Sequence, residues 1–126
     1  MNVLLVDDSK SMRDIHKKVL AAELGEVRFF EAGDCVEALS IIAATPEGFG
    51  LILIERDIPN MDGITLITRI RERDKVTPLI MATTESGKSR VIEAIRAGVN
   101  NYLVKPFTPE LLAEKVRQTL EKQKAA

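Results

Sequence analysis

Charged side chains stand at the ends of three short apolar runs in this chain. Asp7 and Asp8 follow the first run, Glu55 ends a later one, and Lys105 ends the last. If these runs are parallel strands, their carboxyl ends lie along one edge of the sheet and meet in one crevice. We therefore expect three carboxylates and one ammonium group to lie close together.

Such a cluster favours a cation and a phosphoryl group. Two like charges 4 Å apart repel by about 4 kcal/mol at an effective dielectric constant near 20, and a hard divalent cation relieves this repulsion. Mg²⁺ typically takes one or two carboxylates together with waters and phosphate oxygens. Without a cation, one of the acids should have a raised pKa. Taken alone, Asp7 and Asp8 fit a solvated loop that caps the next helix equally well.

Two further positions suit a phosphate ligand. Lys105 would offer a mobile point charge, and Pro106 favours an extended backbone before it and allows a cis peptide bond. Thr83 and Thr84 end another apolar run, so one of their hydroxyls can face the crevice and donate to a phosphoryl oxygen. The alternatives are an ordinary surface lysine, and threonines that serve strand propensity and helix capping.

The order of apolar patterns predicts five strand–helix units. Short apolar runs lie at residues 3–6, 27–30, 51–54, 79–82 and 102–104; continuous apolar runs are typical of strands covered on both faces, whereas residues 27–30 include Arg28 and are expected nearer an edge. Between them, apolar residues recur at helical spacing. Parallel strands joined in this way need helices on both faces of the sheet.

Helix ends are also marked in the sequence. Ser11 with Asp14 indicates a capping box at one helix start, and Thr108 before Pro109 indicates another. Gly98 stands where a helix should end, because glycine accepts a left-handed conformation at little cost.

Length and composition indicate one compact domain. The chain has 126 residues, 45% of them apolar, and a net charge of -1, which gives no general attraction to nucleic acid or to an anionic membrane. The single Cys35 excludes an internal disulfide framework. The first ten residues do not read as a signal peptide, and no apolar stretch approaches the roughly 20 residues that span a bilayer. We expect a cytoplasmic protein.

Other candidate sites are weaker. His16 has no Cys or second His to complete a metal site and is expected to be a surface or half-buried histidine. Arg69, Arg71 and Arg73 alternate with other residues on a helix and are expected to be solvated. The chain has no Walker loop, no dinucleotide glycine motif and no nucleophile elbow, which argues against nucleotide hydrolysis or esterase chemistry. We expect a protein that is not an enzyme.

Taken in order, four segments resemble the receiver domain of bacterial two-component response regulators. They are VDDSKSMR around Asp7, IPNMDG ending at Gly63, Thr83, and LVKPF around Lys105. The likeness is greatest to stand-alone chemotaxis-type receivers. It implies an α/β fold, a doubly wound, flavodoxin-like (βα)₅ parallel sheet with strand order 2-1-3-4-5, an order known for such receivers. It also implies that residues 1–126 form a single receiver domain without an output domain.

The resemblance assigns roles to the crevice residues. Asp7 and Asp8 would hold Mg²⁺, and Asp57 stands where the family lends a backbone carbonyl to the metal. Thr83 and Lys105 would bind a phosphoryl group that a histidine kinase delivers to the residue four before the proline of the IPNMDG turn.

The resemblance also implies how the signal leaves the domain. Thr83 and Tyr102 would act as the switch, with Tyr102 turning inward on activation. The fourth helix, fifth strand and fifth helix would contact the histidine kinase or an output protein. Nucleic acid and membranes are not expected as partners, and we expect a monomer or a weak dimer.

Glu55 occupies the acceptor position, where the family pattern has aspartate. Glutamate reaches about 1.5 Å further, roughly one C–C bond, and a misplacement of 1 Å can slow a positioned reaction about 100-fold. We therefore expect Glu55 to be a poor acceptor whose carboxylate reaches Thr83 or Lys105 and partly imitates the phosphorylated state. The imitation is incomplete because a phosphoryl group brings more charge and three acceptor oxygens. Glu55 would weaken the binding of Mg²⁺ or displace the ion.

Two other functions, and the origin of Glu55, stay open at this point. The chain is alternatively an active Mg²⁺-dependent response regulator that accepts a phosphoryl group on Glu55 or, with a spacing that fits Pro59 less well, on Asp57. A small-molecule binder on the same scaffold is a more distant alternative. The same sequence would also result from replacing aspartate by glutamate in an ordinary receiver.

Overall fold

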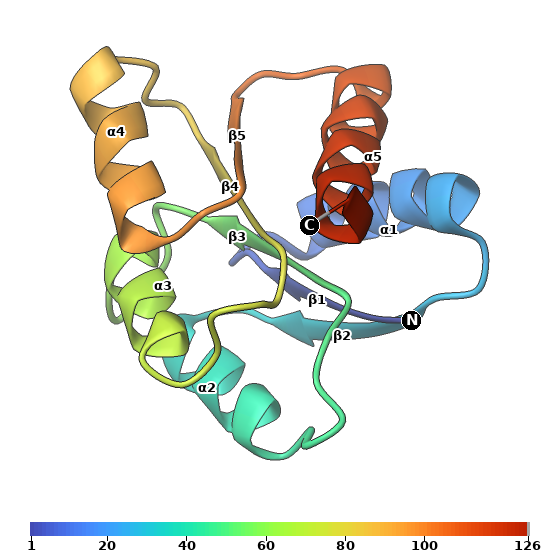
Figure 1. The fold of residues 1–126 in the computed structure, drawn as a ribbon, viewed down its shortest axis with the longest axis horizontal. Coiled ribbons are helices and arrows are strands. Elements are labelled where there is room, and N and C mark those ends of the chain that lie inside the picture. The colour runs from blue at the N-terminus through green and yellow to red at the C-terminus, as the bar shows by residue number, and fades with distance from the viewer. Residues whose placement is uncertain (126) are drawn as a thin grey trace.

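The computed structural model describes residues 1–125, and within them five strands alternate with five helices (Figure 1). The strands are β1 (Asn2–Val6), β2 (Arg28–Ala32), β3 (Leu51–Glu55), β4 (Leu79–Thr83) and β5 (Asn101–Val104). The helices are α1 (Lys10–Leu24), α2 (Cys35–Ala43), α3 (Gly63–Arg71), α4 (Lys88–Ala97) and α5 (Pro109–Ala125). All strand pairs are parallel, in the order β2-β1-β3-β4-β5, which confirms the predicted sheet.

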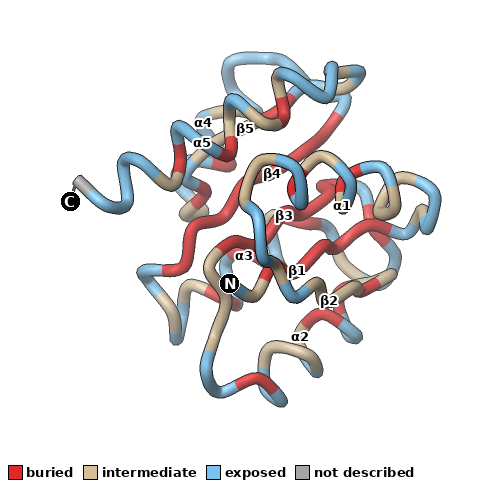
Figure 2. Tube along the Cα trace, turned by 90° about the vertical axis from the view of Figure 1, so that its right-hand side faces the viewer, coloured by how far each residue is buried: buried red, intermediate tan, exposed pale blue. Residues whose placement is uncertain are grey.

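Alternation along the strands builds two apolar layers. Successive side chains of a strand point to opposite faces, so Val3 and Leu5 pack with α1 and α5 while Leu4 and Val6 pack with α2 and α3. Figure 1 shows α1 and α5 together on one side of the sheet and α2, α3 and α4 on the other. The central strands are buried along their whole length, as Figure 2 shows. No helix within residues 1–125 is both long enough and apolar enough to cross a membrane.

The observed elements differ from the predicted ones mainly at their ends. The edge strand β2 is shifted toward Ala32, because Glu31 lies within it and pairs with Arg13 and Lys17 on α1. Four strands keep their predicted runs and gain one residue at one end.

The predicted capping box at the first helix is wrong. Ser9, not Ser11, is the N-cap, and its side chain accepts a hydrogen bond from the Met12 N–H. Asp14 instead forms ion pairs with Lys10 and Lys17 on the same helix. The start of α5 is as predicted, since Thr108 Oγ1 accepts from the Leu111 N–H.

Arg71 is not the solvated residue that the sequence predicted. Its guanidinium donates to the carbonyl oxygens of Gly98, Asp74 and Thr77 and to Asn100 Oδ1. It therefore ties the end of α3 to the two loops that enter β4 and β5. The periodicity of α3 cannot show this role of Arg71, because all the groups that accept its hydrogen bonds lie outside the helix.

We predict that Arg71→Met destabilises the fold by about 2–4 kcal/mol, because it leaves several backbone carbonyls without their donor. Urea denaturation followed by circular dichroism measures the change. Arg69→Met is the matched control: Arg69 is exposed on the same helix, and its replacement should change the free energy of unfolding by no more than about 0.5 kcal/mol. Equal effects of the two substitutions would contradict the bracing role.

Candidate functional site

The register between β1 and β3 brings two of the predicted acids together. Val6 pairs with Ile54, and Asp7 and Glu55 each follow one member of that pair. Both residues are buried at the carboxyl edge of the sheet, with 6% of their surface exposed.

The other side of the crevice is built by β4 and β5 in the same way. Glu55 pairs with Ala82, so Thr83 lies one residue further along β4. Thr83 in turn pairs with Val104, and the Lys105 N–H donates to the Thr83 carbonyl at 2.7 Å. The strand ends therefore deliver the acidic, hydroxyl and basic side chains to one place, as the apolar runs predicted.

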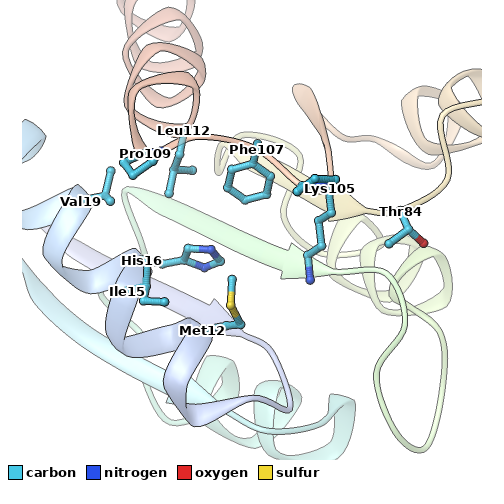
Figure 3. A pocket seen from close by; sticks show the side chains of 10 residues that line it. Met12, Ile15, His16, Val19, Thr84, Lys105, Phe107, Pro109 and Leu112 are labelled. Carbon is cyan, nitrogen blue, oxygen red and sulfur yellow. The ribbon is translucent and has the colours of Figure 1, made fainter.

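Glu55 and Lys105 form a direct ion pair between Oε2 and Nζ. The Glu55 side chain is 7% exposed and that of Lys105 is 23% exposed, so the pair is largely shielded from water. Figure 3 shows Lys105 reaching back from the end of β5 toward the end of β3. The Lys105–Pro106 peptide bond is cis, one of the forms that the sequence allowed.

The pKa of Glu55 is raised, as expected for one acid of the cluster. The main cause is burial, which the Lys105 ammonium opposes; the neighbouring charge of Asp7 adds only a smaller contribution in the same direction as burial. The raised pKa of Glu55 therefore comes first from the loss of water around its carboxylate, and only to a smaller extent from the repulsion between acids that the sequence predicts.

Thr83 is fully buried, and its hydroxyl is engaged with the loop that follows β4. Thr83 Oγ1 accepts from the Glu85 N–H at 3.2 Å. Tyr102 is half-buried, and its hydroxyl donates to the Glu85 carbonyl at 2.7 Å. The two predicted switch residues therefore hold the same loop residue through its two backbone groups. Of the two groups that Glu55 was expected to reach, it contacts Lys105.

Asp8 and Asp57 lie in exposed loops at the rim of the crevice. The Asp57 N–H points at Glu55 Oε1 at 3.5 Å, a long contact, and the residue lies beyond the end of β3. The turn that follows is pressed against β3: a Cβ at Gly63 would meet the Arg56 Cα at 2.9 Å, so only glycine fits there without a shift.

The residues fit a magnesium ion only in part. Asp7 keeps one carboxylate oxygen bonded to the Ser9 N–H at 2.9 Å, and Glu55 is committed to Lys105. Within the described residues 1–125, no three carboxylate, imidazole or thiol groups converge as a metal cluster. The resemblance to receiver domains implies a bound Mg²⁺ at this edge. Here the donors left for it are Asp7 and Asp8, which is within the one or two carboxylates that Mg²⁺ commonly takes.

Sequence reasoning missed Arg56, which is buried although it carries a charge. Its guanidinium forms ion pairs with Glu85 in the loop after β4 and with Glu93 on α4. The available signal was a basic residue placed directly after a buried strand, between two acids. Its partners lie in other segments, so the sequence around Arg56 carries no pattern that identifies them.

A cavity of about 410 Å³ lies between α1 and α5, beside Lys105. Figure 3 shows His16 and Met12 on α1 facing Phe107 across it. The His16 and Phe107 rings are stacked with centroids 5.7 Å apart, and His16 is 4% exposed. The prediction of a surface or half-buried histidine is therefore wrong: the imidazole is buried and closes an apolar wall. Burial lowers its pKa, and the charge of Asp7 opposes this shift.

We predict that this histidine makes the fold less stable in mild acid. Because the pKa of His16 in the folded state lies below its ordinary value, the unfolded chain binds the proton more readily, and stability falls as the pH falls through about 6.5. His16 is the only histidine in the chain. Urea unfolding between pH 7.5 and 5.5 should therefore show a slope of up to about 1.4 kcal/mol per pH unit that His16→Leu removes. An unchanged slope in the variant would count against this assignment.

Known proteins similar to this chain share one description. The family model for the response regulator receiver domain matches residues 3–117. The chain is 43% identical over 122 residues to a chemotaxis protein CheY homolog of Campylobacter jejuni, covering 95% of this chain and 92% of that protein. It is also 43% identical over 122 residues to chemotaxis protein CheY1 of Helicobacter pylori, covering 95% and 97% of the two chains.

Solved structures agree with the sequence comparison. The chemotaxis response regulator CheY4 of Vibrio cholerae is 33% identical, with a TM-score of 0.82 over 94% of this chain and 97% of that one. A CheY-like receiver domain from Methanospirillum hungatei is 29% identical, with a TM-score of 0.85 over 98% and 96%. This chain therefore belongs to the family of response regulator receiver domains.

Proposed function

We propose that this two-component receiver acts through protein–protein contacts and that Glu55, rather than a phosphoryl group, sets its state. The observation that carries the proposal is the shielded ion pair between Glu55 and Lys105. In the family pattern Lys105 would bind the phosphoryl group, and here a carboxylate of the same chain already occupies its ammonium. A receiver of this kind would be largely independent of phosphorylation.

The ion pair also explains why Glu55 should be a poor nucleophile. In-line transfer needs a carboxylate oxygen placed to attack phosphorus, and it needs Lys105 free to stabilise the charge that develops. The ion pair engages both the Glu55 carboxylate and the Lys105 ammonium, so neither group is free for the transfer. A phosphoryl group arriving from a donor would have to break the ion pair before either residue could take part.

The remaining acids fit a reduced metal site. In our proposal Mg²⁺ would be held by Asp7, Asp8 and the backbone carbonyl of Asp57, without a carboxylate from β3. Because Glu55 faces Lys105, the ion would bind more weakly than in a receiver that offers aspartate there. Asp57 itself lies in the exposed loop past the strand end, which does not favour it as an alternative acceptor.

The surface formed by α4, β5 and α5 is the proposed contact with a histidine kinase or an output protein. Exposed apolar side chains gather on its elements: Ile92 and Ile95 on α4 and Val104 on β5 are 37%, 58% and 37% exposed. We propose a cytoplasmic receiver formed by residues 1–126 as one domain, a monomer or weak dimer, without nucleic-acid or membrane partners.

We predict that the protein takes up little phosphate from a small acyl phosphate donor in the presence of Mg²⁺. Mass spectrometry of the intact protein would detect a phosphoryl adduct of about 80 Da, and peptide mapping would locate it. A stoichiometric adduct on Glu55 would show that the chain is an active phosphoryl acceptor instead. An adduct on Asp57 would likewise replace the proposal.

We predict that Glu55→Asp restores labelling under the same conditions, because the shorter side chain frees Lys105 and withdraws the carboxylate by about 1.5 Å. Labelling should rise on the order of 100-fold over the parent chain. Glu55→Gln, which keeps the length of glutamate without its charge, is the matched control and should stay unlabelled. If Glu55→Asp also stays unlabelled, another feature has disabled the crevice.

A further inference from the structure

Arg56 stands at the centre of a charge network that joins three elements. Its Nη2 donates to Glu93 Oε1 on α4, and its Nε lies 3.6 Å from Glu85 Oε2 in the loop between β4 and α4. Arg90 contacts the same two carboxylates, at 3.1 Å from Glu85 and 3.5 Å from Glu93. Two arginines and two glutamates therefore balance each other across the gap between β3 and α4.

The two arginines differ in burial. The Arg56 side chain is 7% exposed, whereas that of Arg90 is 50% exposed. Burial alone would lower the pKa of Arg56, but the carboxylates of Glu93 and Glu85 more than offset this, so its pKa is raised. Exposed ion pairs contribute little, while removing one partner of a buried pair is costly. The buried Arg56 is therefore the member of the network with the largest effect on its neighbours.

Both backbone groups of Glu85 and one of its carboxylate oxygens contact this part of the molecule. Its N–H donates to Thr83 Oγ1, its carbonyl accepts from the Tyr102 hydroxyl, and its carboxylate faces Arg56 and Arg90. Anything that releases the Glu85 side chain also loosens the backbone carbonyl to which Tyr102 is bonded.

The geometry of β3 explains how one strand end reaches both halves of the switch. Consecutive residues of a strand point to opposite sides. Glu55, the last residue of β3, turns to Lys105 after β5, while Arg56, which directly follows the strand and still donates its N–H to the Ala82 carbonyl, turns to the loop after β4 and to α4.

We propose that Arg56 is a positioning residue that clamps the β4–α4 loop and α4 so that Tyr102 stays bonded to Glu85, which fixes the α4–β5–α5 surface without a phosphoryl group. This inference deepens the proposed function. It rests on it because the proposed function is what makes the fixed α4–β5–α5 surface the contact with a partner protein. The contacts of Arg56 themselves do not involve Lys105 or any phosphoryl donor.

The chain offers a direct readout, because Tyr102 is its only tyrosine and it has no tryptophan. Tyrosine fluorescence of the whole protein therefore reports on Tyr102. Acrylamide, a neutral quencher, measures how accessible the ring is without responding to the change in local charge. We expect Arg56→Met to raise the Stern–Volmer constant about threefold, because the loop and the ring leave their packed arrangement. Arg56→Lys, which keeps the positive charge but lacks the planar fork of guanidinium donors, should lie between the parent and Arg56→Met.

Arg90→Met is the matched control, since Arg90 contacts the same two carboxylates from an exposed position. It should change the quenching constant by less than about 1.3-fold. An unchanged constant in a folded Arg56→Met protein, or equal increases in both methionine variants, would overturn the proposal.

A second variant decides the matter if Arg56→Met does not fold. Glu93→Gln removes the partner on α4 at an exposed position and should raise the quenching constant about twofold with the cooperative urea transition retained. No change in Glu93→Gln would overturn the clamp. All these measurements are made without a phosphodonor, so their failure leaves the labelling of Glu55→Asp, and with it the proposed function, independently decided.

Discussion

The contact between the Glu55 carboxylate and the Lys105 ammonium is the interaction on which the site depends. It joins the ends of β3 and β5, with the end of β4 between them, and it does so at a place shielded from water. A shielded carboxylate with no partner would be costly. Pairing with Lys105 stabilises the charged Glu55 carboxylate. The same pairing leaves the ammonium unavailable to an incoming anion.

The central position of β3 in the sheet allows the residues at its end to contact elements on both sides. The strand lies between β1 and β4, and its last residue is followed by two charged residues in the chain. Glu55 turns toward β5, and Arg56 toward α4. One strand end therefore delivers an anion to one half of the domain and a cation to the other. Neither a longer loop nor an added element is needed, because consecutive residues of an extended chain, here Glu55 and Arg56, point to opposite sides.

The parallel sheet and the meeting of Asp7, Glu55, Thr83 and Lys105 could be predicted from the apolar runs and the rule that parallel strand ends share an edge, whereas the strand order comes only from the resemblance to receiver domains. Arg56, Arg71 and His16 could not be placed. Each is a polar residue whose environment is set by partners outside its own helix or strand: carboxylates on α4 and in the loop before it, loop carbonyls before β4 and β5, and the Phe107 ring. Periodicity describes one element at a time, so it cannot show that such a residue is needed elsewhere.

The proposed imitation of a phosphorylated receiver by Glu55 would be divided between separate contacts. A phosphoryl group carries three acceptor oxygens and can bind an ammonium and a hydroxyl together. The single carboxylate of Glu55 engages Lys105, and Thr83 turns its hydroxyl to the Glu85 N–H instead. The arrangement of the β4–α4 loop must therefore be held by something other than Glu55. Arg56 supplies that hold from the neighbouring position, since it pairs with the side chain of the residue whose backbone Thr83 and Tyr102 bind.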